Sequence, residues 1–321
     1  MKGRKFLLRY GLLSALVALL ILFSFIAPGF LSGRNAVNIL REMCILSLFT
    51  MALTTVVIAG GFDLAFASGA TVSGIVGLVL IKNFGWAVLP AFILVFLFNL
   101  ALAGIKGLVV VKLKMPSFIA TLAVGTVCMG FSRLMTGGTT FFAASWPPGF
   151  SFLGRGQIGT IPVQVFILLI TGLIAVNLME RTRLGRYTYA TGGNEEAARH
   201  VGIKTDKTRY ITWIISGILC GLASVTLISQ LGAASPEMGE GYLMPAITSM
   251  FLGCIAYKEG VPNILGSLTA AGVITILSNA FVMMGLRFYW KDVVTGVVLL
   301  IAVGVVSIIK KGKLYDVVAG F

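Results

Sequence analysis

Residues 44–81 read CILSLFTMALTTVVIAGGFDLAFASGATVSGIVGLVLI, and this stretch decides the fold class. It holds two apolar runs, 44–61 and 64–81, which meet at Gly60-Gly61-Phe62-Asp63. A helix that crosses the hydrocarbon core of a bilayer needs about 20 mostly apolar residues. Each run is close to that length, so the stretch predicts two membrane-spanning helices with a break between them.

Similar runs recur along the whole chain of 321 residues. The sequence predicts about ten spans, near 7–27, 44–61, 64–81, 86–105, 116–136, 161–180, 210–231, 242–257, 263–284 and 291–309. Hydrophobic residues make up 58% of the chain and charged residues 11%, whereas soluble domains average about a half and a quarter. These values exclude a soluble enzyme and a nucleic-acid-binding protein, and they predict an all-α polytopic helix bundle in a lipid bilayer.

The basic residues set the expected orientation of the spans. With the first segment inside, most of the 25 Lys and Arg residues fall in segments on the inner side of the membrane. Membrane proteins keep an excess of Lys and Arg in their cytoplasmic loops. We therefore expect both termini in the cytoplasm and the segments 137–160 and 232–241 on the outside.

The sequence lacks the parts of several kinds of chemistry. It has no GxxxxGK[ST] phosphate-binding loop, and so no ATPase site of the P-loop type. His200 is the only histidine, which leaves no multi-histidine metal site and no histidine-based hydrolysis. We expect no cofactor, no metal ion and no enzymatic activity, so either a partner supplies the energy for transport or solute passes passively.

The inner loop 181–209 contains a short helix signature near 194–202. A capping asparagine, acidic residues for the first turn, basic residues for the last turn and a glycine for the left-handed stop follow in order: Asn194, Glu195, Glu196, Arg199, His200 and Gly202. An isolated helix of about two turns is not stable in water. It therefore needs to pack against its own membrane domain or against a partner, unless it is incidental to a solvated basic loop.

Several segments, taken together, carry a resemblance to a known family. The loop resembles the cytoplasmic loop in the membrane subunits of ribose-type bacterial ABC importers, which include xylose, galactoside and autoinducer-2 permeases. Further segments similar to that family occur in the same order along most of the chain. The matching segments are Asn35-Ala-Val-Asn-Ile-Leu40, Gly60-Gly-Phe-Asp-Leu64, Met115-Pro-Ser-Phe-Ile-Ala-Thr-Leu122, Thr182-Arg-Leu-Gly-Arg186 and Ala190-Thr-Gly-Gly-Asn-Glu-Glu-Ala-Ala-Arg199.

The resemblance implies a single transmembrane permease domain over residues 1–321, in the plasma (inner) membrane of a bacterium. It implies the path for a sugar or sugar-like solute that an extracytoplasmic binding protein delivers. The implied partners are ATP-binding cassette ATPase subunits and a second permease, either another copy or a related chain. The helix near 194–202 would be the coupling helix, with the ATPase docking on Gly193, Asn194, Glu195, Glu196, Arg199 and Gly202.

Two segments depart from the pattern of that family. Asp63-Leu-Ala-Phe-Ala67 stands where DLSVG is usual, so residues 65–67 differ. The usual glycine-rich turn is replaced over Cys254–Pro262, where Tyr257 and the charged pair Lys258-Glu259 intrude. The departures leave open which solute is carried and which partner subunits are used.

Polar and aromatic residues inside the spans are candidates for lining a solute path. The expected set is Phe62, Asp63, Phe66, Asn99, Gln230 and Asn279. Asp63 follows two glycines that permit a helix break, and the two phenylalanines could form an apolar gate beside it. For each polar residue the alternative role is a hydrogen bond between neighbouring helices.

A stand-alone ion-coupled secondary transporter or a passive channel is the alternative function. Such a carrier usually needs buried carboxylates or discontinuous helices for its driving ion. Asp63, next to the break at Gly60-Gly61, is the main candidate for such a carboxylate, and a single carboxylate is weak support for ion coupling. A stand-alone carrier also has no use for a loop of the coupling type.

Overall fold

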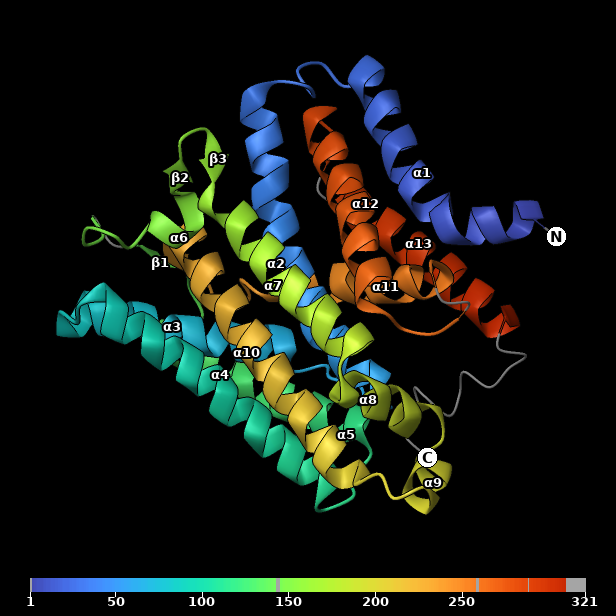
Figure 1. Ribbon diagram of the computed structural model, residues 1–321. Helices are drawn as coiled ribbons and strands as arrows, with labels where there is room; N and C mark the ends of the chain where they lie inside the picture. The colour runs from blue at the N-terminus through green and yellow to red at the C-terminus, as the bar shows by residue number, and fades with distance from the viewer. Residues whose placement is uncertain (1, 143–144, 258–259, 288, 310–321) are drawn as a thin grey trace.

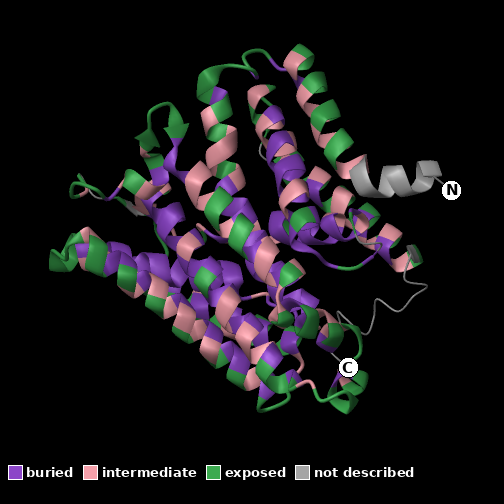
Figure 2. Cartoon of the chain, in the orientation of Figure 1, coloured by how far each residue is buried: buried purple, intermediate pink, exposed green. Residues whose placement is uncertain are grey.

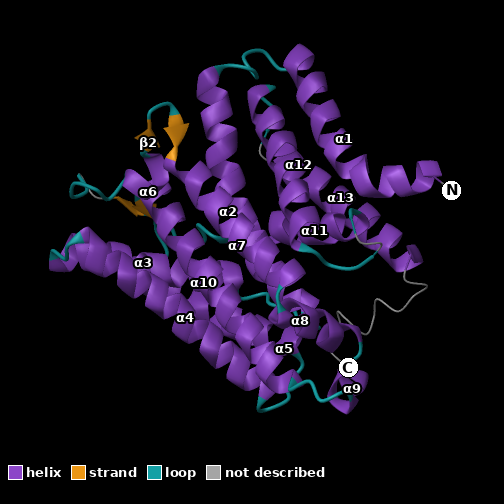
Figure 3. Ribbon diagram, viewed as in Figure 1, coloured by secondary structure: helices purple, strands orange, loops and turns teal. Residues whose placement is uncertain are grey.

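The computed structural model describes residues 2–142, 145–257, 260–287 and 289–309, and nearly all of them are helical (Figures 1 and 3). The long helices are α1 (Lys2–Ile26), α2 (Gly33–Ile58), α3 (Phe66–Phe84), α4 (Val88–Val111), α5 (Ser117–Thr136), α7 (Val163–Arg181), α10 (Thr205–Leu231), α11 (Leu243–Ile255), α12 (Ile264–Met283) and α13 (Tyr289–Ile309). The short elements are β1 (Phe141–Phe142), α6 (Phe152–Arg155), β2 (Gln157–Ile158), β3 (Ile161–Pro162), α8 (Arg183–Gly193), α9 (Glu195–His200), β4 (Ala233–Ala234) and η1 (Glu240–Tyr242).

Each predicted span coincides with one of the long helices. Within the described residues, 8 helices are long and apolar enough to cross a membrane, and a shorter apolar helical stretch covers Gly11–Ile26. The prediction of an all-α polytopic membrane protein is confirmed. The number of spans and the side on which the termini lie stay predictions, and the segments 258–259 and 310–321 lie outside the described residues.

The start of α2 differs from the prediction by 11 residues, because the helix begins at Gly33 rather than near residue 44. Ser32 caps it, with its hydroxyl accepting from the Asn35 backbone N–H at 3.3 Å. The first turns carry Arg34, Asn35, Arg41 and Glu42, and their low hydropathy hides the beginning of the helix. A helix packed inside a bundle can carry polar residues where they meet polar partners or a cavity.

The loop 181–209 holds a second helix, α8, that the sequence analysis did not predict. Thr182 caps α8, accepting from the backbone N–H of Gly185 at 3.3 Å. The buried residues of α8 are Gly185, Thr188 and Thr191. This buried face is small and polar, so it differs from the apolar stripe that a helix usually packs against its neighbours.

The helices differ strongly in how far they are enclosed (Figure 2). The apolar window of α2 is 83% buried within the chain, whereas that of α13 is only 17% buried. The largest enclosed side chains include Trp213, Phe49 and Phe66. The exposed face of α7 carries large apolar residues such as Leu169 and Leu173, as a surface in contact with lipid requires. Thus α2 is a central helix and α13 is peripheral.

The segment 232–242, most of which the sequence places on the outside, folds back against the helices of the protein. The backbone N–H of Gly239 donates to Thr71 Oγ1 at 3.0 Å, and Gly239 packs against the Ala67 carbonyl. Helix α11 starts directly after this segment and has 13 residues. At 1.5 Å per residue it is roughly 20 Å long, less than the ~30 Å of a bilayer core. The segment and α11 therefore form one discontinuous element.

Candidate functional site

The joint between α2 and α3 is an irregular segment in which most backbone N–H groups donate to nearby acceptors. Gly60 has φ of +82°, a left-handed conformation that favours glycine. Ser117 Oγ accepts from the Phe62 N–H at 3.0 Å, and Thr121 Oγ1 accepts from the Leu64 N–H at 3.0 Å. Helix α5 thus supplies the hydrogen bonds that a break inside a membrane protein requires.

Asp63 forms an ion pair that is enclosed in the protein. Its Oδ2 lies 2.5 Å from Lys106 Nζ of α4, and the two side chains are 0% and 4% exposed. Its Oδ1 accepts from the Ala65 N–H at 2.9 Å. The ammonium of Lys106 also lies 5.6 Å from the ring centroid of Trp213, within the range of a cation–π contact. The pair ties the joint to α4 and α10. Lys106 lies within α4, just beyond the predicted end of that span at residue 105.

Aromatic rings surround the joint on both sides. The Phe62 ring centroid lies 6.3 Å from that of Phe118 and 6.5 Å from that of Phe251. Phe66, at the start of α3, packs on Phe49 with a centroid distance of 5.5 Å. Phe62 is 4% exposed and Phe66 is 1% exposed. Phe62 and Phe66 are therefore both enclosed by other aromatic rings, and their role as a gate stays a prediction.

The joint touches α8 directly. A Cβ at Gly60 would lie 3.4 Å from the Cα of Gly192. A Cβ at Gly192 would overlap the Ile58 carbonyl oxygen, so this contact has no room for a side chain. At Gly193, the next residue, a Cβ would meet nothing within 4 Å. The loop 181–209 and the α2–α3 joint are thus packed backbone to backbone.

Helix α8 is also fixed to α7 through a tyrosine. Tyr189 donates its hydroxyl to Glu180 Oε1 at 2.9 Å. Burial and the neighbouring carboxylate raise the pKa of the Tyr189 phenol, so it stays protonated and keeps donating. A displacement of α8 would therefore be passed to α7 as well as to the joint.

The capping pattern predicted for α9 is present. Asn194 Oδ1 accepts from the Ala197 N–H at 2.8 Å, and Gly202 adopts φ of +85° after the last turn. Glu195 holds the helix to α10, because its Oε2 accepts from Arg209 Nη1 at 3.1 Å. Its Oε1 accepts from Arg199 Nη2 within α9 at 2.8 Å. The helix that could not stand alone is thus packed on its own membrane domain.

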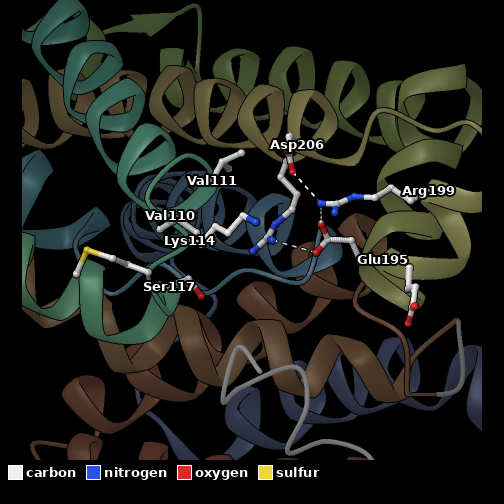
Figure 4. A pocket seen from close by; sticks show the side chains of 10 residues that line it. Val110, Val111, Lys114, Ser117, Glu195, Arg199 and Asp206 are labelled. Atoms are coloured by element: carbon white, nitrogen blue, oxygen red, sulfur yellow. Dashed lines mark hydrogen bonds and ion pairs between the residues drawn. The ribbon is translucent and has the colours of Figure 1, made fainter.

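A pocket of 580 Å³ lies beside this ion cluster (Figure 4). Arg199 of α9 and Lys114 of the α4–α5 loop reach into it from opposite sides (Figure 4). Arg199 also donates to Asp206 Oδ1 at 3.1 Å. The pocket therefore separates α9 from the α4–α5 loop and is lined by charges of both signs.

The outer face of α9 differs from the face held against α10. Glu196, Ala197 and His200 are exposed, and Val201 is 77% exposed. Ala198 is 3% exposed, so the alanines and Val201 do not form one apolar face. Any partner that contacts α9 meets this outer face, while Glu195 and Arg199 serve first to hold the helix.

Removal of the Asn194 cap should loosen α9. We expect Asn194→Ala to cost about 1 kcal/mol of local stability, because the Ala197 N–H loses its acceptor. Amide hydrogen exchange at residues 197–200 should then speed up about fivefold, with Asn194→Asp, which keeps an acceptor, close to wild type. Equal exchange in the alanine variant and wild type would show that the cap does not hold the helix.

The remaining predicted path residues fall in two different places. Asn99 is 3% exposed and donates to Ser73 Oγ at 2.6 Å, in a cluster that joins α3, α4 and α10. Asn279 exchanges two hydrogen bonds of 2.9 Å with Asn35 and lines a cavity beside α2. Gln230 donates to Glu42 Oε1 at 3.0 Å at the edge of the same cavity.

Sequence reasoning missed Glu42, Lys106 and Tyr242 as site residues. Lys106 was treated as a loop residue, and Glu42 lay before the expected start of its span. Tyr242 donates to Glu42 Oε2 at 3.0 Å from a segment 200 residues away. The sequence did hold one signal for Glu42, which directly precedes a long apolar run. An ionisable residue at a membrane span is a candidate for a functional role.

The departures from the family pattern differ in how far they are buried. Ala65 and Ala67 are both 0% exposed, and Ala67 contacts Gly239 of the folded-back segment. Tyr257 has φ of +67° and is 38% exposed. Lys258 and Glu259 lie outside the described residues.

Comparison with known proteins adds a family match. Residues 35–303 match the family described as "Branched-chain amino acid transport system / permease component". The chain is 35% identical to the ribose import permease protein of Bacillus subtilis over 295 residues, which cover 92% of this chain and 91% of the relative. It is 32% identical to the Haemophilus influenzae ribose import permease protein over 305 residues, 93% of each chain. It is 27% identical to the Escherichia coli xylose transport system permease protein over 362 aligned positions, 94% of this chain and 92% of the relative. No solved structure matches.

Proposed function

Because this chain belongs to the transport-system permease component family, we propose that it forms the translocation path of a sugar importer in the inner membrane of a bacterium. It is a multi-pass permease subunit of an ABC importer and is not itself an enzyme, since ATP hydrolysis in such importers resides in a separate subunit. The observation that carries the proposal is the near full-length similarity to ribose import permeases. The solute is then a sugar or sugar-like compound.

The proposed topology has ten spans, with both termini in the cytoplasm and residues 1–321 as one permease domain. The basic loop 181–209 supports this orientation, because cytoplasmic loops carry the excess of Lys and Arg. Helices α8 and α9 lie together at one end of α7 and α10, and α6, β2 and β3 lie at the other end (Figure 1). The first end is assigned to the cytoplasm and the second to the outside.

The proposed partners are ATP-binding cassette ATPase subunits, an extracytoplasmic solute-binding protein and a second permease. The ATPase docks on the coupling region 194–202, including Gly193, Asn194, Glu196 and Gly202. Val201 and Glu196 support this assignment, because both are exposed. Glu195 and Arg199 contribute by fixing α9 to α10, through Arg209 and Asp206 respectively.

The proposed solute path includes Phe62, Asp63, Phe66, Gln230 and Asn279, with Asn99 behind it. ATPase closure moves α9 and α8, and the Gly192–Gly60 contact passes this movement to the joint that holds Phe62 and Asp63. A coupling of this kind requires two states with different contacts at both sites. The aromatic contacts of Phe62 and Phe66 are those of the closed state.

Substitution of Val201 tests the docking surface. We expect Val201→Asp to reduce co-purification of the ATPase subunit at least about tenfold, because an exposed apolar contact at a partner interface becomes charged. The tagged permease is purified in mild detergent from its native membrane, and co-purifying chains are quantified by mass spectrometry.

Thr139→Asp is the matched control, since Thr139 is exposed and follows the last turn of α5, at the opposite end of that helix from the α4–α5 loop. It should retain the ATPase at the wild-type level. Equal recovery with Val201→Asp and wild type would remove α9 from the docking surface. Recovery of no ATPase with wild type would contradict the importer proposal itself.

A further inference from the structure

A second cavity, of 310 Å³, lies between α2, α12, α13 and the start of α11. Asn38, Glu42 and Leu46 line it from α2, and their spacing of four places them on one face of that helix. Glu42 is roughly 24 Å along α2 from Ile58, where α2 meets α8. In the proposed orientation the cavity therefore lies in the outer half of the membrane domain.

The lining is rich in neutral hydrogen-bonding groups. Glu42 is held by two uncharged donors, Gln230 Nε2 on one oxygen and Tyr242 Oη on the other, each at 3.0 Å. A carboxylate has about four lone-pair sites, so Glu42 keeps acceptor capacity toward the cavity. Asn38 and Ser278 also face it, and among the described residues neither side chain has a hydrogen-bond partner.

The lining of the cavity carries one negative and one positive side chain. Glu42 and Lys291 are the two charged residues among those that line the cavity. Their opposite signs favour a neutral solute over a net anion or cation. Amide, hydroxyl and carboxylate groups together match the hydroxyls of a sugar, each of which both donates and accepts.

The position of the cavity relates it to the gate. Tyr242 ends the folded-back segment and Pro245 lies in the first turn of α11, and both line the cavity. The Tyr242 ring packs on Phe49 at a centroid distance of 5.5 Å, and Phe49 packs on Phe66 at 5.5 Å. Tyr242 therefore connects the wall of the cavity, through Phe49, to Phe66 beside the joint.

We propose that this cavity is a solute subsite within the permease, and that it takes a neutral polyhydroxylated compound of monosaccharide size. Glu42 and Tyr242 are its specificity-determining residues. The proposal rests on the proposed sugar-import function and adds the place and chemistry of the contact. Solute that leaves the binding protein is held above the Phe49–Phe66 contact until the gate opens.

The test uses cysteine protection in the complete complex of permease, ATPase and binding protein in liposomes. The four native cysteines are buried, so a cysteine introduced by Ser278→Cys is the reactive one for a charged, membrane-impermeant thiosulfonate added outside. D-ribose should slow its modification, and Asn38→Cys provides a second position on the same cavity. Thr139→Cys, outside the cavity, should be modified at the same rate with and without D-ribose.

Glu42→Gln and Tyr242→Phe keep side-chain size and remove single hydrogen-bonding functions. In the Ser278→Cys background, each should raise the D-ribose concentration for half-protection. We expect a rise of about tenfold for Glu42→Gln, which is about 1.4 kcal/mol, because hydrogen bonds to a charged acceptor are stronger than those to a neutral one. No protection by D-ribose or D-xylose at either cysteine, or protection by L-leucine instead, would overturn the subsite. Wild-type uptake of the sugar, measured in the same liposomes, tests the proposed function separately, because it can persist when protection fails.

Discussion

Replacement of Asp63 by Asn should destabilise the protein by about 3–5 kcal/mol, because Lys106 would keep its charge in a buried place without a counter-ion. The Asp63 side chain is 0% exposed and that of Lys106 is 4% exposed, so water cannot replace the lost partner. The Asn side chain can still accept from the Ala65 N–H, so the effect isolates the ion pair. Thermal unfolding of the purified permease in detergent measures the loss.

The double variant Asp63→Asn with Lys106→Met is the matched control. It removes both charges, so it should recover most of the stability lost in either single variant. Arg133→Gln breaks the ion pair between Arg133 and Glu237. Both side chains of that pair are more than half exposed, so its loss should change the stability little. Losses that simply add in the double variant would show that the two charges do not depend on each other.

Gly192→Ala should abolish the coupling between ATP hydrolysis and uptake, with transport falling at least about tenfold. The new Cβ would overlap the Ile58 carbonyl oxygen and come within 2.9 Å of the Gly60 nitrogen. Overpacking in a tight site costs about 1–3 kcal/mol, and here it forces α8 away from the α2–α3 joint. Sugar uptake and ATP hydrolysis, measured together in liposomes that contain the complex, give the ratio of the two rates.

Gly193→Ala is the matched control, since a Cβ there meets nothing within 4 Å. It should transport at close to the wild-type rate. If Gly192→Ala and Gly193→Ala keep the same ratio of uptake to hydrolysis as wild type, the contact between α8 and the joint does not carry the movement.

The helices were predictable because a membrane span is a local property of the sequence. A run of about 20 apolar residues is long enough to cross the hydrocarbon core of a bilayer. The predicted bounds of α5 and α12 lie within one residue of the observed ones. The cap of α9 was predictable for the same reason, since Asn194 and Gly202 act on residues next to them. These features need no knowledge of which helices are neighbours.

The parts that were not predicted depend on contacts between distant segments. Glu42 was read as a boundary residue because its partners, Gln230 and Tyr242, come 188 and 200 residues later. Lys106 fell just beyond the predicted end of its span at residue 105, because its partner Asp63 lies more than 40 residues earlier, in the joint between α2 and α3. Each polar residue lowers the mean hydropathy of a segment and so argues against a membrane span. Only the packed structure shows which polar residues have hydrogen-bonding or ionic partners.

Uptake by reconstituted liposomes tests the central claim most directly. Liposomes receive the permease alone or the permease with its ATPase subunits, and loaded binding protein and radiolabelled D-ribose are added outside. We predict uptake only when the ATPase is present and ATP is trapped inside, with none from the permease alone under a proton or sodium gradient. Uptake by the permease alone, driven by an ion gradient and indifferent to ATP, would contradict the account.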